Sequence, residues 1–263
     1  MLTVNFDVLP NPMRATYDSI GLNYSDLRKP DFHIEKLILE SLGTAKTVLN
    51  VGAGTGSYEP TDRLVTAIEP SIEMIRQRSM SAAHVIQGSA EDLPFDDNSF
   101  DASMAILTIH HWGDKEKGVQ EMRRVTRGPI VFLTFDPLHQ TYWLADYFPE
   151  LVKLDEMHMP RLSEFEKWLG PVEIQPVLIP HDCTDGFLGG YWRRPAAYLD
   201  AKVRTAMSSF WATDNVAAGI ERLESDLNSG DWEKKNSELL ELDEYDFGYR
   251  LVISKVKLGT NRN

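Results

Sequence analysis

The stretch VLNVGAGTG, residues 48–56, decides the fold predicted for this chain. A short apolar run leads directly into Gly52, Gly54 and Gly56, as expected of a buried parallel strand that ends in a turn. Glycine permits a positive φ at such a turn and leaves backbone amides open to a ligand. In open α/β sheets these turns lie at the carboxyl ends of the strands, where ligands bind.

A second apolar run, LVTAIEP at 64–70, ends in a carboxylate. Glu69 is placed to accept hydrogen bonds from both hydroxyls of a ribose. The turn is not a nicotinamide fingerprint, because Ser57 stands where GxGxxG requires its third glycine. It is not a Walker-type phosphate loop either, because Ser57 and Tyr58 replace the required Lys and Ser or Thr. Taken alone, the glycines are also compatible with a tight turn that binds nothing.

Strand and helix patterns alternate on both sides of this unit. Helix patterns begin near Asp31, Ser71, Asp114 and Arg161. The further strand patterns are AHVIQGS, FDASMAILTI, PIVFLTFDP, PVEIQPVLIP and YRLVISKV, which begin at residues 83, 100, 129, 171 and 249. Because parallel strands need crossovers that cover a sheet face, this order predicts an α/β fold with a doubly wound, mostly parallel seven-stranded sheet.

The same patterns divide the chain into three parts. We expect residues 1–30 to form an N-terminal lid or arm, because they are irregular and contain proline. Residues 31–180 together with 246–258 form the predicted core. Residues 181–245 form a predicted helical cap, inserted before the last strand, whose main helix ends at Gly230.

Composition and charge narrow the partners. Hydrophobic residues make up 42% and charged residues 25%, as in ordinary globular proteins. With 40 acidic against 27 basic residues, the net charge of −13 disfavours nucleic acids and anionic membranes. Cys183 is the only cysteine, which excludes an internal disulfide and fits a reducing compartment. The first residues lack the features of a signal peptide, so we expect a cytoplasmic location.

Several further motifs occur in a fixed order after the glycine turn and Glu69-Pro70-Ser71. They are GSAEDLPF at 88–95, NSFDASMAILTIHHW at 98–112 and EMRRVTRGPIVFLTFDP at 121–137. This set closely resembles the class I S-adenosylmethionine-dependent methyltransferases, specifically the bacterial subgroup of ubiquinone/menaquinone-type and other small-molecule methyltransferases. The resemblance covers about residues 15–137. It implies a Rossmann-like fold, S-adenosyl-L-methionine as cofactor, S-adenosyl-L-homocysteine as product, and methyl transfer to a small-molecule O-, N- or C-nucleophile.

The resemblance also implies a set of cofactor-binding residues. We expect these to be Tyr24, Asn50, Gly52, Ala53, Gly54, Glu69, Pro70, Ser71, Met74, Ser89, Ala90, Glu91 and Leu107. The chain departs from the family at Asn50, where the glycine motif usually has an acid, and at Ser89, where an Asp is common. Only 12 residues separate Gly56 from Glu69, which predicts a very short helix after the loop.

Methyl transfer is an in-line displacement in which alignment provides much of the catalysis, and a general base helps where the acceptor carries a proton. His111 is our first candidate for that base, followed by His110, both just beyond the fourth strand; Asp136 follows the fifth. Each also has a plain structural interpretation, as a hydrogen-bonded histidine or a turn cap. The candidate acceptor-binding residues, which are equally compatible with core or surface roles, are Trp112, Trp143, Tyr191 and Arg194. No metal site is predicted, because the two histidines are adjacent and no HxxxH or CxxC pair occurs.

Two other functions are compatible with the same motifs. One is a catalytically inactive or regulatory S-adenosylmethionine-binding protein. The other is an enzyme that uses a related sulfonium cofactor for different chemistry, which the replacement of an acid by Asn50 favours slightly.

Overall fold

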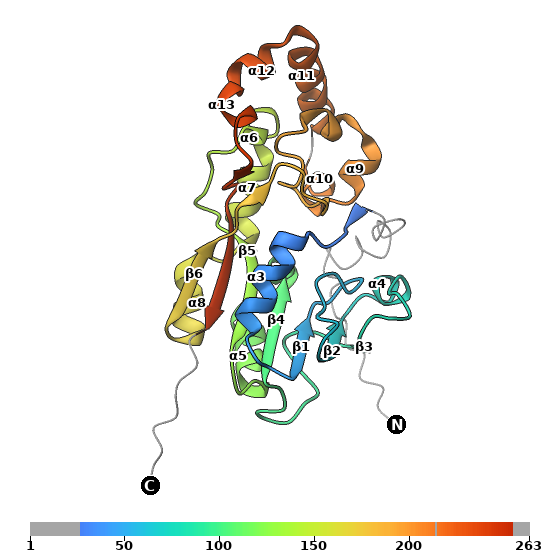
Figure 1. Cartoon of the computed structure of the whole chain (residues 1–263), viewed down its shortest axis with the longest axis vertical. Coiled ribbons are helices and arrows are strands. Elements are labelled where there is room, and N and C mark those ends of the chain that lie inside the picture. The colour runs from blue at the N-terminus through green and yellow to red at the C-terminus, as the bar shows by residue number, and fades with distance from the viewer. Residues whose placement is uncertain (1–26, 214, 255–263) are drawn as a thin grey trace, which may run out of the picture.

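A seven-stranded sheet forms the centre of the computed structural model, which describes residues 27–213 and 215–254 (Figure 1). Across the sheet the strands follow the order β3-β2-β1-β4-β5-β9-β6. Their bounds are β1 (Thr47–Val51), β2 (Leu64–Glu69), β3 (His84–Gln87), β4 (Ala102–Ile106), β5 (Ile130–Phe135), β6 (Val172–Pro176) and β9 (Tyr249–Ser254). Neighbouring strands from β3 to β5 run parallel, whereas β9 is antiparallel to β5 and β6. The predicted α/β class with a mostly parallel, seven-stranded sheet is confirmed.

Helices cover both faces of the sheet. Successive residues of a strand point to opposite sides, and here both sides carry apolar side chains. In β5, Val131 joins the apolar layer that contains α3 (Phe32–Leu42). The next residue, Phe132, joins the layer that contains α5 (Lys115–Val125) and α8 (Leu162–Leu169). The sheet is therefore wound on both faces, as the alternating pattern predicts.

Side-chain caps begin three of the predicted helices. Asp31 caps α3, Ser71 caps α4 (Ile72–Arg76) and Asp114 caps α5, each by accepting a hydrogen bond from a first-turn amide. The donating amides belong to His33, Met74 and Lys117. These caps fix the residue at which each helix starts.

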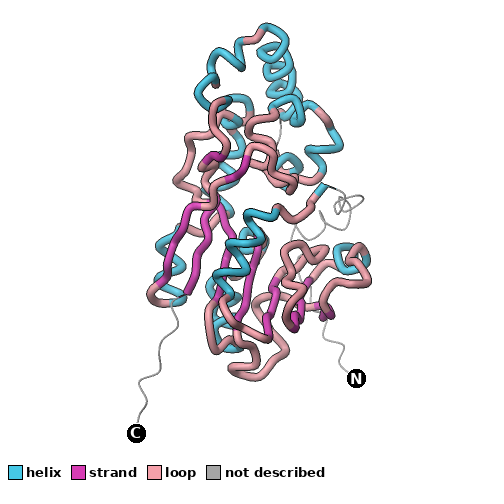
Figure 2. Tube along the Cα trace, viewed as in Figure 1, coloured by secondary structure: helices cyan, strands magenta, loops and turns pink. Residues whose placement is uncertain are grey.

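The connection from β1 to β2 differs from the prediction. Residues 52–63, all of which the structure describes, form turns and bends without a helix (Figure 2). The expectation of a very short helix here was wrong. Few residues are available for the crossover, and Pro60 disfavours helical geometry at Glu59.

The predicted strand at 171–180 is interrupted. It forms β6 and then the separate β7 (Ile179–Pro180), which pairs with β8 (Glu244–Tyr245) in a two-stranded sheet. The amide of Val177 still donates to the carbonyl of Tyr249 at 2.9 Å, so the pairing with β9 ends only after Val177. The short β7–β8 pair brackets the segment predicted as the cap.

A helical layer lies at one end of the sheet, at the top of Figure 1. From the predicted cap it contains α9 (Ala201–Thr205), α10 (Ser208–Trp211), α11 (Val216–Ser229), α12 (Asp231–Lys235) and α13 (Ser237–Leu240). It also contains α6 (Leu144–Tyr147) and α7 (Glu150–His158), which follow β5. The Tyr147 hydroxyl donates to Asp226 of α11 at 2.7 Å, and Arg222 donates to the Tyr147 carbonyl. Residues from the predicted core and the predicted cap thus build one layer.

In the described part of the chain, no helix combines the length and the apolar character needed to cross a membrane. The predicted N-terminal arm falls mostly on residues 1–26, outside the described residues.

Candidate functional site

The glycine turn after β1 has backbone geometry that favours glycine. Gly52 and Gly54 have φ values of 70° and 52°. The amides of Gly52 and Ala53 donate to the carbonyl of Ile68 at 2.9 and 3.0 Å, which ties the turn to β2. A Cβ atom at Gly52 would lie 2.1 Å from Oγ1 of Thr108, so this position has no room for a side chain.

The carboxylate of Glu69 lies beside this turn. Its Oε2 accepts a hydrogen bond from the Gly54 amide at 2.8 Å, and its Oε1 accepts one from the Ser71 amide at 2.9 Å. Glu69 is buried, with 6% of its surface exposed. The ends of β1 and β2 are therefore joined through one oriented carboxylate.

A cavity of about 430 Å³ opens at this junction, within the usual range of ligand pockets. Its described lining includes every predicted cofactor residue except Tyr24, which lies outside the described residues: Asn50, Gly52, Ala53, Gly54, Glu69, Pro70, Ser71, Met74, Ser89, Ala90, Glu91 and Leu107. Sequence reasoning missed further lining residues, namely Arg28, Thr55, Ser57, Tyr58, Ile106, Thr108 and Gly113. The sequence could have indicated three of these, Thr55, Ser57 and Tyr58, because they lie in the glycine loop.

The chemistry of this lining fits an adenosyl sulfonium. Each oxygen of Glu69 can accept more than one hydrogen bond, so the carboxylate can hold a ribose while keeping its backbone donors. Met74 and Ala90 provide apolar walls suited to a flat base. The carboxylate of Glu91 accepts from the amide of Gly113 at 2.8 Å, which fixes that edge of the cavity.

A second carboxylate, that of Glu59, contacts the glycine turn through Asn50, the residue at the position where the family usually has an acid. Asn50 donates from Nδ2 to Glu59 at 3.1 Å. Glu59 in turn pairs with Arg78 at 2.6 Å, and both side chains are at most 7% exposed. Arg78 also donates to the carbonyl of Gly54 at 3.1 Å. This buried pair holds the turn where no helix follows it, and its partners were not predicted because they are distant in sequence.

The two candidate histidines lie on a short 3₁₀ helix, Ile109–His111, after β4. Of the two, only His111 belongs to the described cavity lining. The centroids of the His110 and His111 rings lie 3.8 Å apart. Desolvation lowers the pKa of His111 to about 3, with smaller contributions from the nearby charges of His158 and Lys115. Desolvation also holds the pKa of His110 well below its ordinary value. Both imidazoles are therefore neutral at pH 7.

The remaining candidates are not all brought to the cavity. Trp112 lines it, but Asp136 does not; its carboxylate caps a turn by accepting from the amide of Leu138 at 3.0 Å. Trp143 is buried under the helical layer, and its indole N–H donates to the carbonyl of Trp192.

Tyr191 and Arg194 also lie outside the cavity lining. The guanidinium of Arg194 lies 4.7 Å from the centroid of the Tyr191 ring, and it donates to the carbonyls of Cys183 and Gly190. These contacts give Arg194 the role of a brace within its own segment. Among the described residues, no group of three or more His, Cys, Asp or Glu is arranged to hold a metal ion.

Comparison with known proteins places this geometry in a wider group. A family model described as a methyltransferase domain matches residues 49–130. A crystal structure from Anabaena variabilis ATCC 29413, described provisionally as a methyltransferase from an antibiotic biosynthesis pathway, is 40% identical to this chain. The match covers 87% of this chain and 99% of that one, with a TM-score of 0.81.

Two further relatives show how far the likeness extends. The chloroplastic 2-methyl-6-phytyl-1,4-hydroquinone methyltransferase 1 of Oryza sativa subsp. japonica is 30% identical over 179 residues, which is 62% of this chain and 53% of the relative. This chain spans about half the length of this relative and of three other chloroplastic methyltransferases of the same name that it matches. Phosphoethanolamine N-methyltransferase 2 of Haemonchus contortus, solved with S-adenosyl-L-methionine, shares the fold with a TM-score of 0.53 and 16% identity, over 95% of this chain and 58% of that one.

Proposed function

We propose that this chain, which belongs to the class I S-adenosylmethionine-dependent methyltransferase family, methylates a small molecule bound beside the cofactor cavity. The observation that carries the proposal is the position of Glu69, whose carboxylate joins the glycine turn to the end of β2 at the wall of a cavity. S-adenosyl-L-methionine is the methyl donor of this family, and when bound it supplies a methyl group that is already strongly electrophilic.

The protein's own contribution is mainly orientation. Glu69 would hold the ribose, the backbone of Gly52 and Gly54 would face the methionine part, and Met74 and Ala90 would enclose the adenine. Because Leu107 has a positive φ of 51°, the chain turns sharply at the end of β4 beneath this cavity. An acceptor aligned by such rigid walls needs little further help for an in-line displacement.

His111 would act on the acceptor as a neutral hydrogen-bond acceptor. With its pKa near 3 it is a weak base, so forming an imidazolium in this poorly hydrated wall is unfavourable. A neutral ring can still orient a hydroxyl or amine toward the transferable carbon. The acceptor's proton must then be acidic in its own right or pass to water.

An uncharged, apolar ring compound is the acceptor class that fits best. Ile106, Leu107 and Trp112 supply apolar walls next to His111. The net charge of −13 also disfavours polyanionic acceptors. Since the rice relative is named for a hydroquinone, hydroquinones and phenols are the first compounds to test.

The test begins with calorimetric titration of the purified chain with S-adenosylhomocysteine and S-adenosylmethionine. We expect binding of both, and a Glu69→Gln variant should weaken it roughly tenfold or more, because a charge-assisted hydrogen bond to ribose is lost. Glu73→Gln is the matched control, since Glu73 lies in α4 outside the cavity lining. Release of S-adenosylhomocysteine with hydroquinone, phenol and amine acceptors then identifies the reaction. Absence of nucleoside binding, or equal effects of the two substitutions, would refute the assignment.

A further inference from the structure

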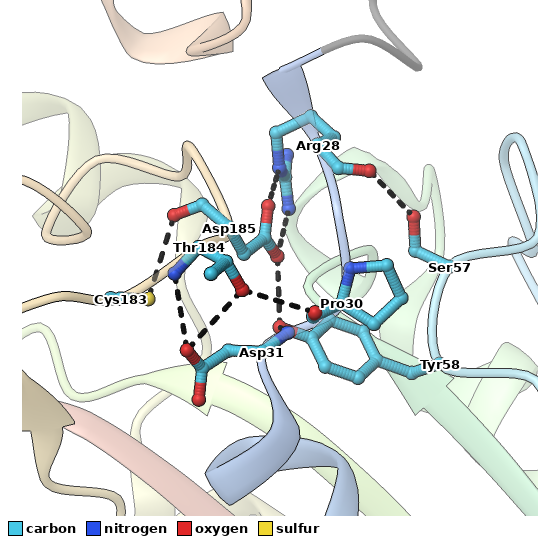
Figure 3. Close-up of polar contacts among 8 residues, drawn as sticks. All are labelled: Arg28, Pro30, Asp31, Ser57, Tyr58, Cys183, Thr184 and Asp185. Carbon is cyan, nitrogen blue, oxygen red and sulfur yellow. Dashed lines mark hydrogen bonds and ion pairs between the residues drawn. The ribbon is translucent and has the colours of Figure 1, made fainter.

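A buried carboxylate from the loop after β7, that of Asp185, contacts Arg28 and Tyr58 (Figure 3). Asp185 is fully buried, and its Oδ1 lies 2.6 Å from Nε of Arg28. Its Oδ2 accepts from Nη2 of Arg28 at 3.3 Å and from the hydroxyl of Tyr58 at 3.0 Å. We call these three residues the Asp185 junction. Arg28 and Tyr58 line the cavity, whereas Asp185 does not.

Backbone contacts reinforce the junction. Arg28 and Asp185 form an antiparallel bridge, and the amide of Gly186 donates to the carbonyl of Leu27 at 3.0 Å. The amide of Thr184 donates to the carboxylate of Asp31 at 3.1 Å (Figure 3). Segments 27–31 and 183–186 therefore meet along several residues.

Tyr58 brings the glycine loop into the same network. Its hydroxyl donates to Asp185 and accepts from the amide of Asp31 at 3.3 Å. Its ring is buried, with 2% exposed, and it has a positive φ of 62°. The end of the glycine loop cannot shift without disturbing the start of α3 and the segment that contains Asp185.

We propose that Asp185 is a positioning residue for the cofactor: it fixes the cavity wall through Arg28 and Tyr58 and so couples segment 183–186 to cofactor binding. This inference rests on the proposed function, because it takes the cavity as the S-adenosylmethionine site. The segment matched by the methyltransferase domain model ends at residue 130, so Asp185 comes from the part of the chain beyond that match.

The physical argument is one of paired desolvation. The Asp185 carboxylate is out of water and is compensated by the Arg28 guanidinium and the Tyr58 hydroxyl. If the carboxylate becomes an amide, this contact with the guanidinium loses its ionic character and the Tyr58 hydroxyl donates to a neutral oxygen, so both side chains are held less firmly. A cofactor must then order them when it binds, which lowers its affinity.

The experiment compares two similar buried pairs. Tyr58→Phe and Asp185→Asn perturb the junction with little change in side-chain volume. Tyr142→Phe is the matched control, because the Tyr142 hydroxyl also lies against a buried carboxylate, that of Asp155 at 3.3 Å, yet neither residue lines the cavity. The readouts are the Kd of S-adenosylhomocysteine by calorimetry, the Tm without ligand, and amide hydrogen exchange of residues 52–58.

We expect Asp185→Asn and Tyr58→Phe to weaken binding roughly tenfold each, and the double variant to weaken it by less than the product of the two effects. Exchange in residues 52–58 should rise in both variants, while Tyr142→Phe leaves Kd and this exchange unchanged. Lower Tm values with Kd and loop exchange unchanged would show a merely structural role and overturn the inference. Failure of the unaltered chain to bind S-adenosylhomocysteine would overturn the proposed function itself and remove the premise of this inference with it.

Discussion

Alanine substitutions at Gly52 and Gly54 test the structure of the glycine turn and its proposed role in cofactor binding. Both residues have positive φ, 70° and 52°, so either alanine costs about 1–2 kcal/mol of folding free energy in that conformation. They differ in their surroundings. A Cβ at Gly52 would lie 2.1 Å from Oγ1 and 2.9 Å from Cγ2 of Thr108, whereas a Cβ at Gly54 would meet nothing within 4 Å.

The clash adds an overpacking cost to Gly52→Ala. Forcing a methyl group into a packed site costs about 1–3 kcal/mol, so the total loss in unfolding free energy should be about 2–5 kcal/mol. Gly54→Ala should lose only the conformational part, about 1–2 kcal/mol. Because Gly54 lines the cavity with open space at its Cβ position, its alanine should instead lower cofactor affinity more strongly, relative to its effect on stability.

Urea unfolding of the ligand-free variants measures the first difference, and calorimetric titration with S-adenosylhomocysteine measures the second. The companion variant Gly52→Ala/Thr108→Gly removes the clashing side chain and isolates the conformational cost at position 52. Equal destabilisation by the two alanines would show that Gly52 is not packed against Thr108. An unchanged affinity in Gly54→Ala would show that the cofactor does not approach the turn.

Three further predictions concern buried ionisable groups. Arg78→Met should lower the free energy of unfolding, measured in urea, by about 3–5 kcal/mol, because Glu59 stays buried without its ionic partner. Adding Glu59→Gln should recover part of that loss, whereas unchanged stability in Arg78→Met would refute the bracing role. Because the pKa of His111 is lowered to about 3, below pH 6.5 the unfolded chain binds a proton that the folded chain excludes. The free energy of unfolding should therefore fall as pH drops from 6.5 toward 4, by up to about 1.4 kcal/mol per pH unit. His111→Gln should flatten this slope. Burial raises the pKa of Asp155 to about 7, so this group contributes with the opposite sign and stability falls as pH rises from about 4 through 7. Asp155→Asn should therefore make the unfolding midpoint less sensitive to pH between 5 and 8. A pH profile identical to that of the unaltered chain would contradict this prediction.

Structural features that depend on residues close together in the chain are the ones that the sequence predicted. The caps at Asp31, Ser71 and Asp114 are local, and each lies where the sequence pattern starts a helix. The glycine turn and Glu69 are separated by few residues, and the parallel pairing of β1 and β2 brings their ends together. This is why the sequence could predict that these residues lie together at one edge of the sheet.

Asp136 and Trp143, two candidates that follow β5, do not line the cavity, and their residue types could not show this in advance because each type serves several roles. Asp136 after a strand has the same appearance whether it faces a ligand or caps a turn, and here it caps a turn. Trp143 is equally at home in a pocket or a core, and it is buried beneath the helical layer. Sequence periodicity distinguishes exposed from buried faces but not one buried environment from another.

The sheet architecture, the helix starts and the glycine turn could be predicted from the sequence alone, because they depend on short-range backbone preferences and on apolar periodicity. Only the tertiary structure decided that Glu59 and Arg78 brace a turn without a helix, and that Asp185 meets Arg28 and Tyr58 across more than 120 residues. Such ion pairs form between segments that the fold brings together, and the pairing of charges that are distant in the chain leaves no periodic signal.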